Sequence, residues 1–226
     1  MPDFISAHAT DLICFVLSAM ALLGYQLYLN WRTLHDPASS AQDVMLVARE
    51  AWVECVMRER RDILAVQTLR NSTMAASFMA STAVLLIIGV LTLSAQGEKL
   101  SGTWHVLNFL GHVSAEMWLF KLLTMLFDLL FAFFAFSMSV RLYHHIGYSI
   151  NVPLALQIEQ AQPRRVMAHM NRAGIFYRIG TRAYYYIVPL LFWLFDPLLL
   201  VGATTALIFF LYHLDRAPRN DKDLMG

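Results

Sequence analysis

The residues best placed to do chemistry are three ionisable residues inside apolar segments. Lys121 and Asp128 are seven positions apart in one such segment, and Asp196 precedes Pro197 in another. On a helix, residues seven apart share a face but lie about 10 Å apart along the axis. Thr124 falls between the first two on that face. This pattern predicts one interior polar site formed by Lys121, Thr124, Asp128 and Asp196.

An ion pathway is the chemistry that such a site suggests. Burying an ionised group at membrane depth costs at least about 2.5 kcal/mol, so these side chains are expected to face a protein interior, a partner or water. Pro197 has no N–H and bends a helix, which frees backbone carbonyls for cation binding. The structural alternative is that Lys121 extends to the surface or pairs with Asp196, and that Asp128 caps a buried polar network.

No pattern indicates a metal site, a cofactor or an enzyme. The eight histidines include no HExxH motif, the two cysteines form no CxxC pair, and Gly-rich phosphate loops and GxSxG elbows are absent. A pair such as His112 and His213 is the one alternative for zinc or haem. We therefore expect no metal, no cofactor and no catalytic residue.

The elements that must position the polar residues are four long apolar segments. Apolar residues make up 58% of the 226 residues and charged residues 15%, against roughly half and about a quarter in a soluble domain. A helix needs about 20 apolar residues to cross a bilayer. The segments lie at about residues 12–29, 71–94, 117–143 and 184–212. They predict an all-α, polytopic integral membrane protein with a single membrane domain over residues 1–226.

The distribution of basic residues orients these spans. Twelve arginines lie in or beside two long loops, at about residues 31–70 and 144–183, whereas four basic residues lie on the other side. The positive-inside rule places the two loops in the cytoplasm. Because four spans put both termini on one side, both are expected outside the cytoplasm, in a cell (inner) membrane. The net charge of +1 gives nucleic acid nothing to attract it.

Both long loops carry helical patterns. Residues 43–70 contain no Gly or Pro, and apolar residues recur near helical spacing among Arg and Glu, which predicts an amphipathic helix that continues into the second span. In the second loop, Pro153, Pro163 and Gly174 bracket one or two short helices. On the outer side, residues 104–115 are too few to span a bilayer and predict an interfacial helix.

Basic residues in the second long loop predict contacts with anionic lipids. Six arginines in and beside this loop oppose Glu159 alone, a charge of +5. The inner leaflet of a membrane is anionic and attracts such segments. The expected lipid contacts are Arg164, Arg165, Arg172, Arg178 and Arg182. The alternative is ordinary charge that only sets the orientation of the protein.

A row of small residues in the second span predicts a helix contact. Thr73, Ser77 and Ser81 recur at four-residue spacing, with Ala76 and Ala80 beside them. Small side chains at that interval let two helices approach closely. We expect this row to pack against another helix.

Three sequence strings together resemble a known family. They are RRDILAVQTLRNSTMAASFMASTAVLL from Arg60 to Leu86, FFAFSMSVRLYHHIGYSIN from Phe133 to Asn151, and TRAYYYIVPLLFWLFDPLLL from Thr181 to Leu200. In this order they resemble the domain-of-unknown-function 599 family, membrane proteins of bacteria and plants. The resemblance covers spans two to four with their flanks. It implies a four-span fold and attaches no activity to particular residues.

Two functions of different classes follow from these features. One is a homo-oligomeric channel or transporter for a small ion or solute, because a four-helix protomer is small to enclose both a path and its own packing. The other is an accessory or assembly subunit that docks on a larger membrane complex through its helical loops and aromatic spans. A lipid-acting enzyme ranks third. The expected partners are membrane lipids, with either further copies of the chain or other membrane subunits.

Overall fold

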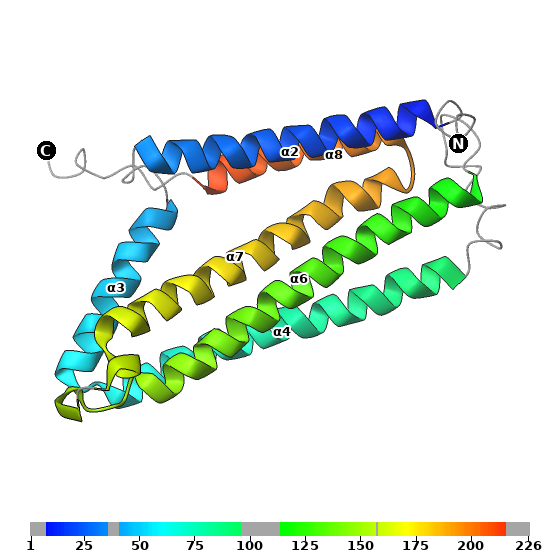
Figure 1. The fold of residues 1–226 in the computed structure, drawn as a ribbon. Helices are drawn as coiled ribbons and strands as arrows, with labels where there is room; N and C mark the ends of the chain where they lie inside the picture. Colours follow the sequence, from blue (N-terminus) through cyan, green and yellow to red (C-terminus); the bar gives the residue numbers. More distant parts are fainter. Residues whose placement is uncertain (1–7, 36–40, 96–113, 157, 216–226) are drawn as a thin grey trace, which may run out of the picture.

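The protein is a set of long helices packed lengthwise (Figure 1). The computed structural model describes residues 8–35, 41–95, 114–156 and 158–215. Within these residues all regular structure is helical, which confirms the predicted all-α class. The α-helices are α2 (Ala9–His35), α3 (Ala41–Glu59), α4 (Asp62–Ala95), α6 (Ala115–Ser149), α7 (Pro163–Trp193) and α8 (Pro197–Leu214). Two short 3-10 helices, η2 (Leu154–Leu156) and η3 (Glu159–Ala161), join α6 to α7.

Four of the described helices, α2, α4, α6 and α8, are long and apolar enough to cross a membrane. This confirms the four apolar helices expected from the sequence. Their outer faces carry large exposed apolar side chains such as Phe78 and Phe127, which a bilayer would cover. Residues 104–113, where an interfacial helix is expected, lie outside the described residues.

The segment expected as one span over residues 184–212 is divided between α7 and α8 by a turn at residues 194–196. The chain reverses there, so α8 runs antiparallel to α7 (Figure 1). Asp196 adopts an extended conformation (φ −158°, ψ 139°), and its Oδ1 accepts a hydrogen bond of 2.7 Å from the Leu198 N–H. Pro197 opens α8 at a position where a missing N–H costs no hydrogen bond. The proline expected to bend one helix therefore begins another.

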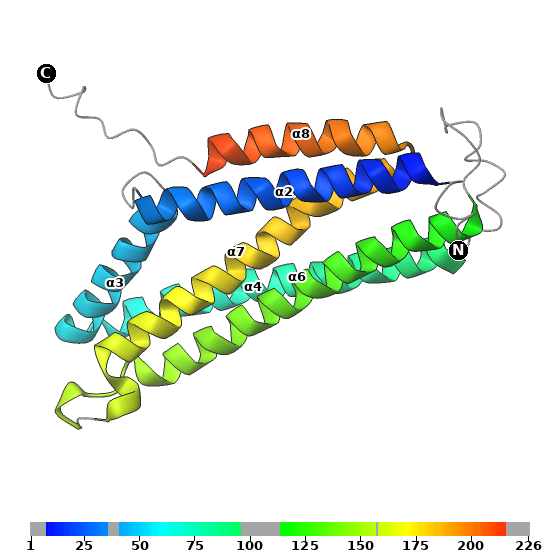
Figure 2. The ribbon, with the colours of Figure 1, turned by 45° about the horizontal axis from the view of Figure 1, so that its top comes forward.

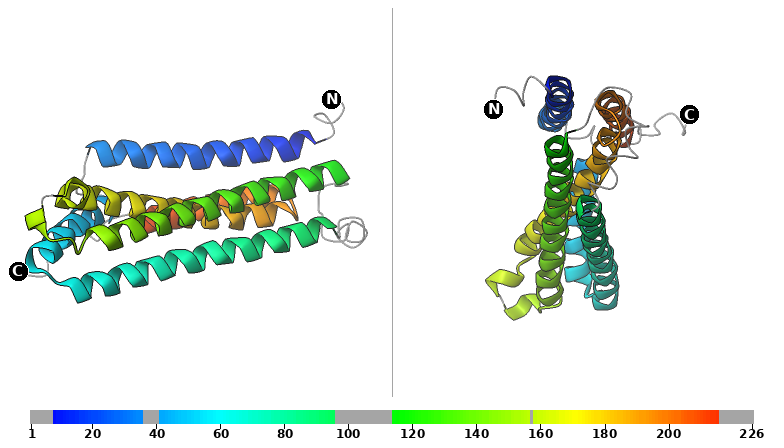
Figure 3. Two further views of the ribbon diagram at one scale, coloured as in Figure 1. Left: turned by 60° about the horizontal axis from the view of Figure 1, so that its bottom comes forward. Right: turned by 90° about the vertical axis from the view of Figure 1, so that its right-hand side faces the viewer.

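The helices pack in the spatial order α4, α6, α7, α8, α2. Figures 1 and 2 show α4, α6 and α7 as an antiparallel row, with α2 and α8 paired beside α7. The right-hand view of Figure 3 looks along the bundle and shows α2 next to α8. The interior therefore includes a region between the α2–α8 pair and the α6–α7 pair.

The helices α2 and α8 run in the same direction. Near the start of α2, Asp11 Oδ1 accepts a hydrogen bond of 3.0 Å from Nε1 of Trp193, the last residue of α7. Farther along α2, the Tyr25 hydroxyl donates a hydrogen bond of 2.9 Å to Oδ2 of Asp215, which follows α8. The start of α2 and the end of α8 thus lie at opposite ends of the bundle. We call these the Asp11 end and the Asp215 end.

A lobe around α3 continues the bundle at the Asp215 end (Figure 1). The α3 lobe comprises α3, the first turns of α4, the last turns of α6 and the first half of α7, around a core that includes Val53, Leu69, Ile146 and Val166. With 35 residues α6 is about 52 Å long, whereas a bilayer core is about 30 Å thick. The long helices therefore extend beyond a bilayer to build this lobe.

Two boundaries in the α3 lobe differ from the expected ones. The helix expected over residues 43–70 is interrupted at Arg60, whose φ of 54° ends α3 before α4 begins. Conversely, α7 continues through Gly174, where a helix end was expected. A Cβ at Gly174 would lie 1.5 Å from Nη1 of Arg49. This glycine makes room for a side chain of α3 and does not end a helix.

Candidate ion-binding site

Lys121 is buried in an ion pair with Asp11 at the Asp11 end of the bundle. Its side chain is 1% exposed, and its Nζ lies 2.8 Å from Asp11 Oδ1. The same Nζ donates a hydrogen bond of 2.9 Å to the carbonyl of Trp193. The ring of Phe15 stacks on the Trp193 ring with centroids 4.7 Å apart. We call Lys121, Asp11, Trp193 and Phe15 the Lys121 cluster.

Helix ends explain why these groups meet. Trp193 is the last residue of α7, so its carbonyl has no partner within the helix, and the negative end of the helix dipole favours a cation. Asp11 lies in the first turn of α2, where the dipole favours a negative charge. Lys121 of α6 therefore donates to the free carbonyl at the end of α7 and neutralises the acid at the start of α2.

Lys121 pairs with neither acid expected from the sequence. No hydrogen bond or ion pair joins Lys121, Asp128 and Asp196 among the described residues. Asp196 is 4% exposed, and its second oxygen, Oδ2, has no hydrogen-bond partner in the same part of the chain. Thr124 donates its hydroxyl hydrogen to the carbonyl of Phe120 on its own helix, at 2.9 Å. The expected single site is therefore dispersed along the interior.

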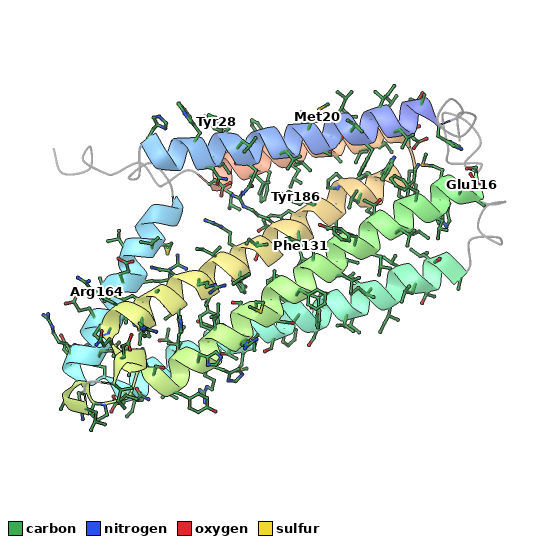
Figure 4. The ribbon with its side chains drawn as sticks, viewed as in Figure 1. Met20, Tyr28, Glu116, Phe131, Arg164 and Tyr186 are labelled. Atoms are coloured by element: carbon green, nitrogen blue, oxygen red, sulfur yellow. The ribbon has the colours of Figure 1, made fainter. Side chains whose placement is uncertain are left out.

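Asp128 brings a carboxyl group without a counter-charge to the middle of α6. It is half-buried, and its Oδ2 is buried with no hydrogen-bond partner in the described part of the chain. Tyr186 of α7 interacts electrostatically with Asp128, Arg182 and Asp215. Tyr186, labelled in Figure 4, also packs against the contact between α2 and α8. Asp128 therefore lies near the interior region without being neutralised there.

A second buried ion pair, missed by the sequence analysis, lies at the Asp215 end. Arg182 of α7 is 7% exposed, and its Nη2 lies 2.7 Å from Asp215 Oδ2. Its Nη1 donates a hydrogen bond to Oε1 of Gln26 on α2. The Tyr25 hydroxyl donates to the same Asp215 oxygen. We call Arg182, Asp215, Gln26 and Tyr25 the Arg182 cluster.

Arg182 was assigned to lipid contact from the sequence, but the structure encloses it in this cluster. The one signal for burial was its position directly before the apolar run at residues 183–193. Arg164, Arg165 and Arg172 are exposed and Arg178 is half-buried, so their lipid contacts stay a prediction. Arg165 also pairs with Glu159.

Two buried hydroxyl groups lie on the faces where α2 and α8 meet. Ser18 of α2 is 5% exposed and Thr204 of α8 is 2% exposed, and neither hydroxyl has a hydrogen-bond partner among the described residues. By contrast, the Thr205 hydroxyl donates to the carbonyl four residues earlier. Ser18 lies seven residues before Tyr25, and Thr204 seven before Leu211, and these two later residues share one apolar cluster. Two helical turns back from that cluster, the hydroxyls are at the same level.

The small-residue row on α4 faces outward. Ser77 and Ser81 are exposed and Thr73 is half-buried. The buried small residues in the apolar part of α4 are Ala76 and Ala83, which face the contact with α6. The small-residue packing within this chain thus uses the neighbouring row. A contact of Thr73, Ser77 and Ser81 with another chain stays a prediction.

No group of three His, Cys, Asp or Glu side chains is placed to hold a metal ion in the part of the chain that the structure describes. His112 lies outside that part. Nδ1 of His213 lies 3.1 Å from the Phe209 carbonyl oxygen of its own helix. Among the described residues, the buried oxygen atoms without hydrogen-bond partners are those of carboxyl and hydroxyl groups and of the Asn171 amide.

The fold and the buried ion pairs define a multi-pass helical membrane protein with a polar interior. Residues 13–220 match the family described as "Protein of unknown function, DUF599". The match covers most of the chain, and the chain therefore belongs to the DUF599 family, in agreement with the resemblance of the three sequence strings. No curated protein and no solved structure matches the chain.

Proposed function

We propose that the protein is a channel or transporter for a small ion, and that it works as a homo-oligomer in the cell (inner) membrane. The observation that carries the proposal is the half-buried Asp128 carboxyl group, which has no counter-charge in the described interior. A charge at membrane depth is costly, so membrane proteins keep such groups mainly where ions or protons pass. Purely structural acids take partners, as Asp11 and Asp215 do.

The proposed topology places the Asp215 end in the cytoplasm and the Asp11 end outside. Of the 17 Lys and Arg residues, Lys99 lies between α4 and α6, and Lys121 and Arg182 are buried in ion pairs. The other 14 lie in the α3 lobe, in the adjoining helix turns or after α8 in the sequence. The positive-inside rule therefore favours this orientation strongly. In this topology the second half of α7 makes a fifth pass through the membrane, and α8 runs back along it. The N-terminus is then outside and the C-terminus is in the cytoplasm, which replaces the expectation of both termini outside.

The outward row on α4 supports self-association. Ser77 and Ser81 present small side chains where a second copy of α4 can approach closely. Large apolar side chains such as Phe78 flank the row and widen the contact. The proposed oligomer contact therefore lies on α4, away from the ion-pair clusters.

We also propose that the exposed arginines of α7 contact anionic lipids. Arg164 and Arg172 are exposed in the half of α7 that belongs to the α3 lobe (Figure 4 labels Arg164). Retention of anionic lipid in a mass measurement should fall on Arg164→Gln with Arg172→Gln. Unchanged retention would mean that these arginines only set the orientation.

A flux assay tests the proposed transport. The purified chain in liposomes should carry an ion flux that empty liposomes lack, measured separately for protons, Na⁺, K⁺ and Cl⁻. Asp128→Asn should remove most of this flux. Phe127→Leu, at the exposed neighbouring position on α6, is the matched control and should leave the flux unchanged. Absence of every flux in correctly folded, oriented protein would refute the proposal.

An accessory or assembly subunit is the second candidate, and the surface of the α3 lobe favours it. Ile63 and Tyr148 are 78% and 81% exposed and lie near the start of α4 and the end of α6, beyond the apolar segments expected at residues 71–94 and 117–143. Exposed apolar side chains in such a setting are typical of protein contacts. Mass measurement after purification in mild detergent separates the two candidates. A closed homo-oligomer supports the transporter, and a reproducible foreign subunit supports the accessory role.

A further inference from the structure

We infer that Asp128 binds a small monovalent cation, either a proton or an alkali ion, inside the bundle between the Lys121 cluster and the Arg182 cluster. This inference rests on the proposed function, because it names the charge class of the species that the interior would carry. It also assigns a role to the two ion-pair clusters, which close the interior at its two ends.

The charges of the interior do not balance. Arg178 is half-buried on α7, one turn before Arg182. The carboxyl groups of the interior belong to Asp11, Asp128, Asp196 and Asp215, and its buried cations are Lys121 and Arg182. Each cation is already paired, one at either end of the bundle. Within the described residues, Asp128 and Asp196 therefore have no counter-charge. An interior with more carboxyl groups than cations attracts a cation and repels an anion.

Of the two unpaired acids, Asp128 is the one available to a ligand. Asp196 uses Oδ1 to cap α8 through the Leu198 N–H. Asp128 makes no such backbone bond in the described chain, and it lies 13 residues after the start of α6. That distance is about 20 Å along the helix, well inside a bilayer core of about 30 Å. Asp128 therefore combines an available carboxyl group with membrane depth.

Neutral oxygens on the contact between α2 and α8 offer further ligands to a cation inside the bundle. The hydroxyls of Ser18 and Thr204 are buried without partners in the described chain. They lie two helical turns from the apolar cluster of α2 and α8 against which Tyr186 packs. Small hard cations prefer oxygen ligands. A buried hydroxyl without a partner is also unfavourable, so a ligand there accounts for its retention.

The ionisable side chains of the interior come from α2, α6 and α7 and from the residues that flank α8. They include Lys121 on α6, Arg182 and Tyr186 on α7, Tyr25 on α2 and Asp215 after α8. The span of α4, over residues 71–95, contains no titratable side chain. Because both cations of this set are held by other acids, none of them neutralises Asp128.

The two clusters act as barriers at the ends of this interior region. The Lys121 cluster joins α2, α6 and α7 at the Asp11 end, and the Phe15 and Trp193 rings stack beside it. The Arg182 cluster joins α2 and α7 to Asp215 at the other end. Since the clusters share no residue, one end can open while the other stays closed. That arrangement suits a cation that reaches Asp128 from one side and leaves to the other.

Equilibrium binding to the purified full chain in detergent tests the cation site. Radioactive Na⁺ and Rb⁺ are measured separately, and one of them should bind saturably. Asp128→Asn should lower that affinity at least tenfold, whereas Asp128→Glu should retain binding. Glu116→Gln, which changes an exposed acid on the same helix, is the matched control and should bind as the unchanged protein does. If the bound cation is a proton, neither isotope should bind. An infrared band of a carboxylic acid should then be present in the unchanged protein, lost in Asp128→Asn and kept in Glu116→Gln.

The outcomes separate this inference from the proposed function. If no alkali ion binds and no carboxyl band depends on Asp128, the cation site is wrong. If an ion binds but no flux is found in liposomes, the site stands and the proposed transport fails. If flux is found and Asp128→Asn leaves it unchanged, transport stands and the site fails.

Cysteine labelling tests the two barriers. In a chain whose native cysteines are changed to Ser, Ser18→Cys should resist impermeant thiol reagents from both sides. Adding Lys121→Met should admit the reagent only from the Asp11 end, and adding Arg182→Gln only from the Asp215 end. The exchanged pair Lys121→Asp with Asp11→Lys keeps opposite charges together, so the cysteine at position 18 should stay unlabelled in that variant. Labelling from the opposite end would overturn the barriers. So would the absence of labelling in both Lys121→Met and Arg182→Gln, provided that each variant elutes as folded protein.

Discussion

Gly180 of α7 faces the ring of Phe136 at a distance that leaves no room for a methyl group. A Cβ at position 180 would lie 2.8 Å from Cζ and 2.9 Å from Cε1 and Cε2 of Phe136. Phe136 is fully buried on α6, with the rings of Tyr177 and Tyr184 against it. The phenylalanine therefore cannot move aside without disturbing its neighbours. We predict that Gly180→Ala destabilises the contact between α6 and α7.

The size of this effect follows from two opposing contributions. Replacing Gly by Ala inside a helix stabilises it by about 1 kcal/mol. Overpacking a buried contact destabilises it by about 1–3 kcal/mol. Gly147→Ala, on an exposed face of α6 where nothing lies within 4 Å of the new Cβ, keeps only the first contribution. The difference in unfolding free energy between the two variants is therefore expected to be about 1–3 kcal/mol.

Denaturant titration in mixed micelles, followed by circular dichroism, measures this difference. The double variant Gly180→Ala with Phe136→Leu removes part of the opposing ring. It should be less destabilised than the sum of its single changes, with a coupling of about 0.5–3 kcal/mol. Equal stability of Gly180→Ala and Gly147→Ala, together with strict additivity in the double variant, would refute the reasoning.

Three further predictions test the ion pair, the oligomer and the topology. Lys121→Met should destabilise the protein by up to about 3–5 kcal/mol, because the half-buried Asp11 then loses its counter-charge, and adding Asp11→Asn should recover part of the loss in an unfolding titration. Strictly additive losses would contradict this pairing. Ser77→Leu should weaken self-association through overpacking, seen as a smaller mass in mild detergent, whereas an unchanged oligomer would show that the row faces lipid. In intact cells, a cysteine at Glu159 should be shielded from impermeant reagents in a chain freed of its own cysteines, and a C-terminal reporter should be active in the cytoplasm. An external C-terminus would reverse the topology.

The first three spans could be placed from the sequence because each is a local property of the chain. The segments expected at residues 12–29, 71–94 and 117–143 lie within α2, α4 and α6. A run of about 20 apolar residues has few alternatives to a membrane helix, since its backbone groups must be satisfied within the segment.

The path of the fourth segment could not be read in the same way. Pro197 indicates that the helix is interrupted there. A proline at this position is compatible both with a bent helix that continues and with a turn after which the chain reverses. The reversal depends on the contact that α8 makes with α2, which lies far away along the chain. The side on which the C-terminus emerges depends in turn on that reversal.

The expected and observed polar sites differ for a related reason. Lys121 was expected inside the bundle and is buried there, because a lysine amid apolar residues must find a partner. Its partner, Asp11, belongs to a helix that joins the site only after folding, as does Trp193, which is 182 positions from Asp11. Asp196 was expected to share the site, but its position before a helix start directs one oxygen to a backbone N–H.

The sequence by itself determined the all-α class, the positions of the first three apolar helices, and that ionisable side chains lie within apolar segments. These properties depend on neighbours within a few turns of the same helix. Only the tertiary structure decided that Arg182 is enclosed with Asp215, that Lys121 takes Asp11, and that Asp128 is left without a counter-charge. The energy of an ion pair depends on the distance between its charges in space, and that distance is set by how the helices pack rather than by the spacing of residues along one helix.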